Sequence, residues 1–324
     1  MTLQFNRQID IQVNDLLLKD LQSSFRVVKT LKKEPNTCEL TIYNLSDDHR
    51  DQIAQTSKPV VEILAGYMPV ESTAGDIDIG AALVAASAAG IQTPPGLVFL
   101  GNVRDAHSVY EPPKWITTIE SGDGEKATRL SRINKSFTAG TSLDIVIAEV
   151  AKSMQVGIGN ALKKAREGKL LDVGSGKEFL NSLTLSGQSA KELNRIVKSA
   201  GLEWSIQDGV LQLLEPNKPL EDISIVLTPT SGMIGSPQIG NDGIIRVRTL
   251  LNSDIVPGRQ IEIQSKILSQ ASSVGGIGVI ADVNLGLDAA LGLGVANHFR
   301  VERVEYTGSN FDNDFYCDIE AKEL

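Results

Sequence analysis

The sequence contains few cysteines, few aromatic residues and a deficit of positive charge, and each shortage excludes a class of protein. The two cysteines, Cys38 and Cys317, do not indicate a disulfide framework, although a single disulfide bond between them stays open. So low a count is typical of a protein that matures in a reducing cytoplasm. An aromatic content of 5% is a poor supply for a carbohydrate- or receptor-binding groove. With 31 basic against 40 acidic residues, the chain does not predict a surface that grips nucleic-acid phosphates.

Long hydrophobic runs are also absent. The longest apolar tract, Ile77–Ile91, is interrupted by Asp78 and is shorter than the roughly 20 residues that a membrane-spanning helix needs. The first residues lack the basic start and apolar core of a secretory signal. We therefore expect neither a membrane span nor export.

Motifs for catalysis or metal binding are missing as well. The histidines, His49, His107 and His298, have no second histidine or cysteine at ligand spacing, so no zinc site is predicted. The acidic loop Asn310–Asp318 is close to the spacing of a calcium loop, but Phe315 replaces the required glycine, which favours a hairpin turn. No G-x-S-x-G elbow or complete G-x-G-x-x-G finger occurs. We predict no catalytic, metal or cofactor site and no enzyme, while a carboxylate pair for glycoside hydrolysis stays open because only geometry would identify one.

Hydrophobic periodicity divides the chain into three segments. Residues 1–130 alternate with a period of two, as half-buried strands do, and one short helix, Ser46–Gln55, interrupts them. Residues 131–240 change to a helical period, and residues 241–324 return to strands. The sequence predicts an α+β protein, mainly β, in which two β domains flank a smaller α+β middle domain.

The middle segment carries signals for two helices and a hairpin. Thr141 with Asp144 and Ser189 with Glu192 have the spacing of capping boxes at helix N-termini. The dipeptide Asp208-Gly209 between two alternating runs is a strong signal for a tight hairpin turn.

The first and third segments have similar outlines. Residues 1–130 carry 12 basic and 17 acidic residues and residues 241–324 carry 7 and 12, so each has a net charge of −5, whereas residues 131–240, with 12 and 11, carry +1. In both β segments a strand precedes an alanine- and glycine-rich insert, Pro69–Pro95 or Ile267–Asn297, and a long hairpin follows. We predict that the chain contains a duplicated β unit, and that the inserts pack as a buried arm or as an intersubunit contact.

The third segment carries a motif of a known family. The run LTPTSGMIGSPQIGNDGIIRVRTLLNSDIVPGRQIEIQS resembles a stretch of the baseplate hub proteins of contractile-tailed bacteriophages, in which a Gly-Ser-Pro turn introduces V-x-x-L-L-N-x-x-I-x-P-G-R. The helix and hairpin from Ser189 to Leu213 are similar to the same family. The motif residues, which are structural and not catalytic in that family, are Leu250, Leu251, Asn252, Pro257, Gly258 and Arg259.

The resemblance implies a subunit with two tail-tube-like β-barrel domains, at 1–130 and 241–324, flanking the middle domain at 131–240. Three subunits would form a pseudo-sixfold ring that joins the hexameric tail tube to the trimeric central spike. The ring would line a channel for DNA without binding it specifically, and its acidic wall would repel the phosphates. Tail tube and spike proteins would be partners, with tape measure and baseplate wedge proteins as further ones, in a virion baseplate assembled in the host cytoplasm.

Alternatives stay open at this stage. The same parts occur in related contractile injection or secretion systems, and some phages attach a cell-wall hydrolase to hub or spike proteins. Arg246 and Arg248 lie on one face of an expected strand, where they are candidates either for ion pairs between subunits or for a solvated strand face.

Overall fold

The computed structural model of the chain describes residues 7–19, 21–56, 59–67, 95–159, 182–220, 223–240, 242–264, 267–270, 280–282 and 298–324. Almost all of both inserts, Pro69–Pro95 and Ile267–Asn297, lies outside these described residues. The prediction that the inserts pack as a buried arm or an intersubunit contact therefore also falls outside them. The described chain consists mainly of strands with a smaller number of helices, which confirms the α+β, mainly β, fold class.

The first segment forms one half of a 15-stranded sheet. Its strands follow the order β3-β4-β7-β6-β5-β1-β2, and all neighbours are antiparallel. Helix α1 begins as predicted, because Ser46 Oγ accepts a hydrogen bond from the His49 amide at 3.3 Å. The elements of this unit are β1 (Arg7–Val13), β2 (Leu16–Leu18), β3 (Ser23–Thr30), β4 (Asn36–Tyr43), α1 (Asp47–Gln55), β5 (Val60–Tyr67), β6 (Gly96–Glu111) and β7 (Lys114–Asp123).

The other half of the sheet contains the third segment and two strands that precede it. Strands β13 and β14 lie within residues 131–240, yet they pair with β16 and β15 and bury Leu227 and Met233 in the core of the sheet. The second β unit therefore starts near residue 224, before the predicted boundary, and the division into domains stays a proposal. Its strands are β13 (Ser224–Leu227), β14 (Met233–Ile239), β15 (Ile244–Leu250), β16 (Gln260–Ile263), β17 (Ile267–Gln270), β18 (Ile280–Asp282), β19 (His298–Ser309) and β20 (Phe315–Glu323).

The middle unit packs two helices against small sheets. Helix α4 follows Ser142 instead of Thr141, and Ser189 is the first residue of α6 and not its cap. The reason is packing: Ser189 is buried against α4, where its Oγ accepts from Ser153 Oγ at 2.9 Å, and Glu192 pairs with Arg195. The elements are α3 (Glu125–Leu130), β8 (Arg132–Phe137), α4 (Leu143–Met154), β9 (Gly157–Ile158), β10 (Leu183–Gln188), α6 (Ser189–Ser199), β11 (Glu203–Gln207) and β12 (Val210–Leu214).

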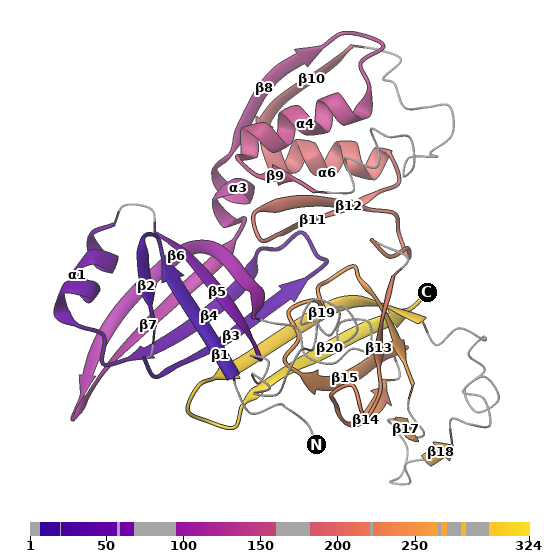
Figure 1. The fold of residues 1–324 in the computed structure, drawn as a ribbon. Coiled ribbons are helices and arrows are strands. Elements are labelled where there is room, and N and C mark those ends of the chain that lie inside the picture. Colours follow the sequence, from indigo (N-terminus) through magenta and orange to yellow (C-terminus); the bar gives the residue numbers. More distant parts are fainter. Residues whose placement is uncertain are drawn as a thin grey trace, which may run out of the picture.

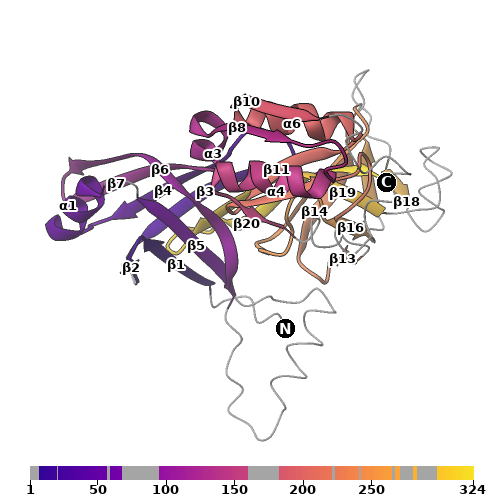
Figure 2. The ribbon, with the colours of Figure 1, turned by 90° about the horizontal axis from the view of Figure 1, so that it is seen from above.

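Two hydrophobic cores hold these units. One cluster runs through both β units and includes Phe25, Ile63, Val304 and Ile319, whereas a second belongs to the middle unit. Figure 1 shows α4 and α6 beyond one end of the large sheet, and Figure 2 shows the same helices from above, over the junction of the two β units. The two β units thus share a core, while the middle unit has its own.

The two β units repeat the same strand order. The order β3-β4-β7-β6-β5-β1 of the first corresponds to β14-β15-β20-β19-β16-β13 of the second. Both long hairpins even carry a bulge at the same place, at 103–105 opposite Glu120 and at 301–303 opposite Glu320. Because a bulge is a specific irregularity, this match supports a duplicated unit. One pairing differs, since β1 is antiparallel to β5 and β13 is parallel to β16.

Candidate assembly interface

The two β units are joined edge to edge by strands β3 and β19. Residues Ser24–Thr30 and Arg303–Ser309 form seven antiparallel pairs, and Figure 1 shows the two strands side by side. On the exposed face, Arg26 Nε lies 2.5 Å from Glu305 Oε1 across this seam. Burial alone would raise the pKa of Glu305, but hydrogen bonds from Arg26 and Arg303 outweigh it and lower that pKa. A continuous β ladder therefore connects the two copies of the unit.

The buried face of this seam is closely packed. Gly308 stands opposite Phe25, and a Cβ on Gly308 would overlap the Phe25 ring. Beside it, the fully buried Tyr306 donates its phenolic O–H to the Ile255 carbonyl at 2.5 Å. Because a slip by one residue would turn these side chains to the other face, the packing fixes the register of β3 against β19.

Each β unit also has a strand edge that lacks a full partner. Strand β6 pairs with β5 only up to Asn102, and no described strand pairs with the outer edge of residues 104–111. At the opposite end of the sheet, the pairs of β14 with β17 that fall within the described residues involve Gln238 and Ile239. In the repeat, β6 corresponds to β19 and β14 to β3, which are the strands of the seam. The chain therefore presents a second set of seam-forming edges.

Opposite charges alternate across the exposed face of β15, β20 and β19. Arg248 donates to both carboxylate oxygens of Asp318, at 2.7 and 2.8 Å, and this hydrogen bonding raises the pKa of Arg248. Arg246 bonds to Asp242 at 2.7 Å and lies 3.8 Å from Glu320. Both arginines named as interface candidates thus have partners in their own chain. Exposed pairs of this kind contribute little to stability, and an interface role for the two arginines stays a proposal.

The first half of the family motif ends strand β15 and starts a turn. The Leu250 amide donates to the Gly232 carbonyl at 2.8 Å, and Leu251 is buried in the shared core. Asn252 Oδ1 then accepts from the Asp254 amide at 2.9 Å, which closes a local turn of the kind asparagine favours. These contacts connect the end of β15 to the turn and to the shared core.

The second half of the motif fastens β16 to β19 and to the end of the middle unit. Pro257 is buried, and Gly258 has a φ of +90°, which favours glycine. The Gly258 amide donates to the Val301 carbonyl at 2.8 Å, and the Val301 amide donates to the Arg259 carbonyl at 2.9 Å. The Gly258 carbonyl accepts from the Leu220 amide at 2.9 Å. The turn is thus a three-way junction of backbone hydrogen bonds.

The tips of both long hairpins expose aromatic residues. At the β6–β7 tip Tyr110 is 51% exposed, and its ring centroid lies 5.1 Å from that of Trp115 with the planes tilted by 44°. The Arg50 guanidinium lies 4.0 Å from the centroid of the Trp115 ring. At the β19–β20 tip the exposed Phe311 meets Tyr43 edge to face at 5.4 Å. Both tips lie at the end of the sheet away from α4 and α6 (Figure 1). Exposed aromatic groups of this kind are common in interfaces.

A buried polar network anchors the middle unit to the opposite end of the sheet. The fully buried Lys29 Nζ donates to both carboxylate oxygens of Asp208, at 2.7 and 2.6 Å. The amides of Asp208 and Gly209 donate to the Asp123 carboxylate at 2.7 and 2.9 Å, and Asn36 donates to it at 3.2 Å. The predicted Asp208-Gly209 hairpin turn is confirmed, with positive φ at both residues. Its role as the anchor was not apparent in the sequence.

Asp123 should make stability depend on pH. Burial raises the pKa of Asp123 from 3.8 to about 6, although the amide of Gly209 acts in the opposite direction. Between these values the folded chain binds more protons than the unfolded chain, so the contribution of this carboxyl to stability falls as pH rises through the window. We expect urea unfolding to show this slope in the wild type and a flatter one in Asp123→Asn, which stays uncharged. Parallel profiles would contradict the raised pKa.

The other candidate sites can be placed as well. Cys38 and Cys317 are free and buried, and burial raises the pKa of Cys317 to about 12. The loop that follows Ser309 is the turn of the β19–β20 hairpin, which confirms that prediction. Within the described part of the chain, no group of three or more histidine, cysteine, aspartate or glutamate residues could hold a metal ion. In the same part, no helix is long and apolar enough to span a membrane.

The fold of the chain, with two β units joined edge to edge and an α+β unit between them, is similar to the folds of solved phage tail proteins. A 43 kDa tail protein of prophage MuSo2 from Shewanella oneidensis superposes with a TM-score of 0.56 at 9% identity, over 98% of each chain. A tail protein from Neisseria meningitidis gives 0.55 at 8% identity, over 98% of this chain and 97% of that one. An Escherichia coli component of the type VI secretion system gives 0.51 at 8% identity, over 97% and 76%.

The family follows from the sequence. The family described as Baseplate hub gp41 matches residues 2–273, and the chain belongs to it. No curated protein sequence matches the chain. The protein is therefore a structural component of a phage tail baseplate hub, which confirms the resemblance carried by the Leu250–Arg259 motif.

Proposed function

We propose that three copies of the chain close into a non-enzymatic ring that joins a hexameric tail tube to a trimeric spike. The observation that carries this proposal is the seam of β3 with β19, together with the unpaired edges of β6 and β14. Since β6 is the equivalent of β19 and β14 of β3, β6 of one subunit can pair with β14 of the next as the two units pair within a chain. Each chain supplies β3-β4-β7-β6 and β14-β15-β20-β19, so three chains of eight strands would give an inner barrel of 24.

The internal seam also sets the expected register between subunits. Thr307 stands opposite Arg26 in the seam. Val109 lies four residues after Asp105, which pairs with Glu120 of β7 at the bulge. Thr307 lies four residues after Arg303, which pairs with Glu320 of β20 at the matching bulge. Val109 is therefore the equivalent of Thr307. In the first β unit, Arg26 pairs with Glu39, and Glu39 pairs with Glu120. In the second, Gln238 pairs with Arg246, and Arg246 pairs with Glu320. Gln238 is therefore the equivalent of Arg26. Val109 of one subunit should therefore face Gln238 of its neighbour.

Ring closure requires a local exchange of partners. Strand β17 covers Gln238 and Ile239 in the single chain, so it must leave β14 when a neighbouring β6 arrives. It pairs over two residues, whereas the internal seam has seven pairs. An intersubunit seam as long as the internal one would therefore increase the number of paired residues and remove an exposed edge.

The two ends of such a ring would differ in symmetry. Each chain carries two long hairpin tips at one end of its sheet and a single middle unit at the other (Figure 1). A trimer would then present six similar aromatic tips on one side and three middle units on the other. We assign the hexameric tube to the side of the tips and the trimeric spike to the side of the middle units.

The exposed face of the eight strands would line the channel. Its arginines are paired with carboxylates, as Arg26 is with Glu305 and Arg248 with Asp318, so the wall carries little uncompensated positive charge. Phosphates would find few free cations there, which fits passage of DNA without specific binding. Tape measure and wedge proteins, and assembly in the host cytoplasm, belong to the same proposal.

Cross-linking tests the register directly. The double variant Val109→Cys/Gln238→Cys, oxidised under mild conditions, should form a covalent trimer on a denaturing gel. The native Cys38 and Cys317 are buried and do not interfere. The matched control is Val109→Cys/Ile234→Cys, because Ile234 is an exposed residue of the same strand but lies out of register. Equal trimer in both variants, or none in either alongside particles without a ring in negative-stain images, would contradict the proposal.

A further inference from the structure

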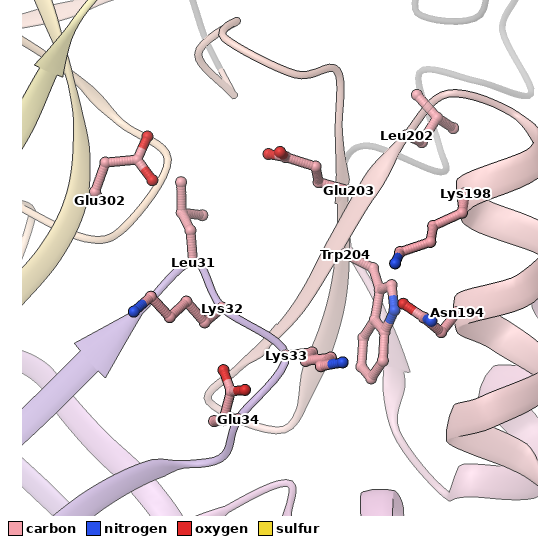
Figure 3. A pocket seen from close by; sticks show the side chains of 10 residues that line it. All are labelled: Leu31, Lys32, Lys33, Glu34, Asn194, Lys198, Leu202, Glu203, Trp204 and Glu302. Carbon is pink, nitrogen blue, oxygen red and sulfur yellow. The ribbon is translucent and has the colours of Figure 1, made fainter.

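A cavity of about 360 Å³ lies between the first β unit and the middle unit. The β3–β4 turn, Leu31–Glu34, forms one wall, helix α6 with the start of β11 forms the other, and Glu302 of β19 lies at the edge (Figure 3). All residues that line the cavity belong to a single chain, so its properties do not depend on ring closure.

Its lining contains hydrogen-bond donors that have no acceptor. Trp204 is only 6% exposed, and its Nε1 is buried without a hydrogen-bond partner. Figure 3 shows the Nε1 edge of this indole beside Asn194, with the amines of Lys33 and Lys198 near the ring. Among the described residues, neither lysine has an ion-pair partner. A buried donor without an acceptor is destabilising, and an acceptor group on a ligand would offset this cost.

The acids around the cavity do not neutralise these donors. Glu302 is held by Arg300 at 2.6 Å, and Glu203 lies 3.6 Å from the same guanidinium. Glu34 is exposed on the turn of the first β unit. Two of the three acids are thus engaged elsewhere, and the lysines remain available to an incoming anion.

We propose that this cavity binds an acidic peptide segment of a neighbouring protein, with one carboxylate held between Lys33 and Lys198 near the Trp204 edge. The indole ring and Leu31 supply an apolar wall for the methylene groups of a glutamate. A charge-assisted bond from a lysine to a carboxylate is stronger than a neutral one. A nucleic-acid backbone fits less well, because its phosphate groups have no methylene groups to lie against the apolar wall that Leu31 and the indole ring form.

Tryptophan fluorescence can test the proposal on the full chain. Trp115→Phe leaves Trp204 as the one tryptophan of the sequence, so its emission reports on the cavity. Titration with a hexaglutamate peptide at low salt should give a saturable change in emission. In this background, Lys33→Ala or Lys198→Ala should weaken binding roughly tenfold each, the effect expected from losing one charge-assisted contact.

Lys191→Ala is the matched control, since Lys191 is an exposed residue of the same helix that does not line the cavity. Its affinity for hexaglutamate should equal that of the parent. The proposal is overturned if hexaglutamate causes no saturable change, or if all three lysine variants weaken binding equally. Tighter binding of a single-stranded hexathymidylate would likewise overturn it, and would assign the cavity to nucleic-acid phosphates.

Discussion

Asp208→Asn should lower the free energy of unfolding by about 3–5 kcal/mol, the usual effect of removing one partner from a buried ion pair. Lys29 is fully buried, and both Asp208 oxygens accept from its amine. Asparagine keeps the shape of the side chain and tolerates the φ of +52° at this position, so the variant changes charge and little else. Urea unfolding of the full chain, followed by circular dichroism, measures the loss.

Two controls accompany this variant. Asp318→Asn breaks the exposed pair with Arg248 and should cost less than about 1 kcal/mol. Lys29→Met/Asp208→Asn removes both buried charges and should recover most of the stability, because no uncompensated ammonium group remains. If Asp208→Asn costs no more than Asp318→Asn, the network is not the anchor of the middle unit.

Gly258→Ala should be nearly as destabilising. Its φ of +90° disfavours any residue with a Cβ, by about 1–2 kcal/mol. The added Cβ would also stand 2.8 Å from Leu220 Cδ1 and 3.0 Å from Leu214 Cδ2, and overpacking of this kind costs about 1–3 kcal/mol more. The same urea experiment should therefore show a loss of about 2–5 kcal/mol, the sum of both effects.

Gly140→Ala separates the two effects. Gly140 has a similar φ of +81°, but a Cβ there would meet nothing within 4 Å. It should therefore show the backbone effect alone, about 1–2 kcal/mol. Equal losses in the two variants would mean that Leu214 and Leu220 move aside, and that the junction at the motif is looser than its geometry indicates.

Local patterns predicted much of the fold. Period-two runs located the strands of both β units, and Ser46 marked the start of α1 because its side chain acts within one turn. The alternation of β19 is interrupted where a bulge lies between Val301 and Arg303. The capping-box prediction at Ser189 was wrong, because contact with Ser153 on another helix competes with the local cap.

Residues that act across long sequence distances were not predictable in the same way. Lys29 and Asp208 are 179 positions apart, and nothing in either neighbourhood marks the other as its partner. Trp204 lies in a run that alternates as a strand does, and this pattern gives no sign of a cavity. Only the tertiary structure brings α6 and the β3–β4 turn to opposite sides of the indole, where its Nε1 has no acceptor and two lysines line the same cavity. Arg246 and Arg248 were correctly placed on one strand face, but their partners on β20 required the sheet.

The sequence by itself determined the class of fold, the doubled outline, the Leu250–Arg259 turn and the family, because alternation, turn chemistry and motif spacing are local properties of a chain. Tertiary structure decided which edges meet, which charges are buried and where the cavity lies. Seven residue pairs bring β3 and β19 together from opposite ends of the sequence, and their register depends on contacts such as that of the Phe25 ring with Gly308, which join the two β units. Pairing between distant segments is a property of the folded chain, and no local pattern specifies it.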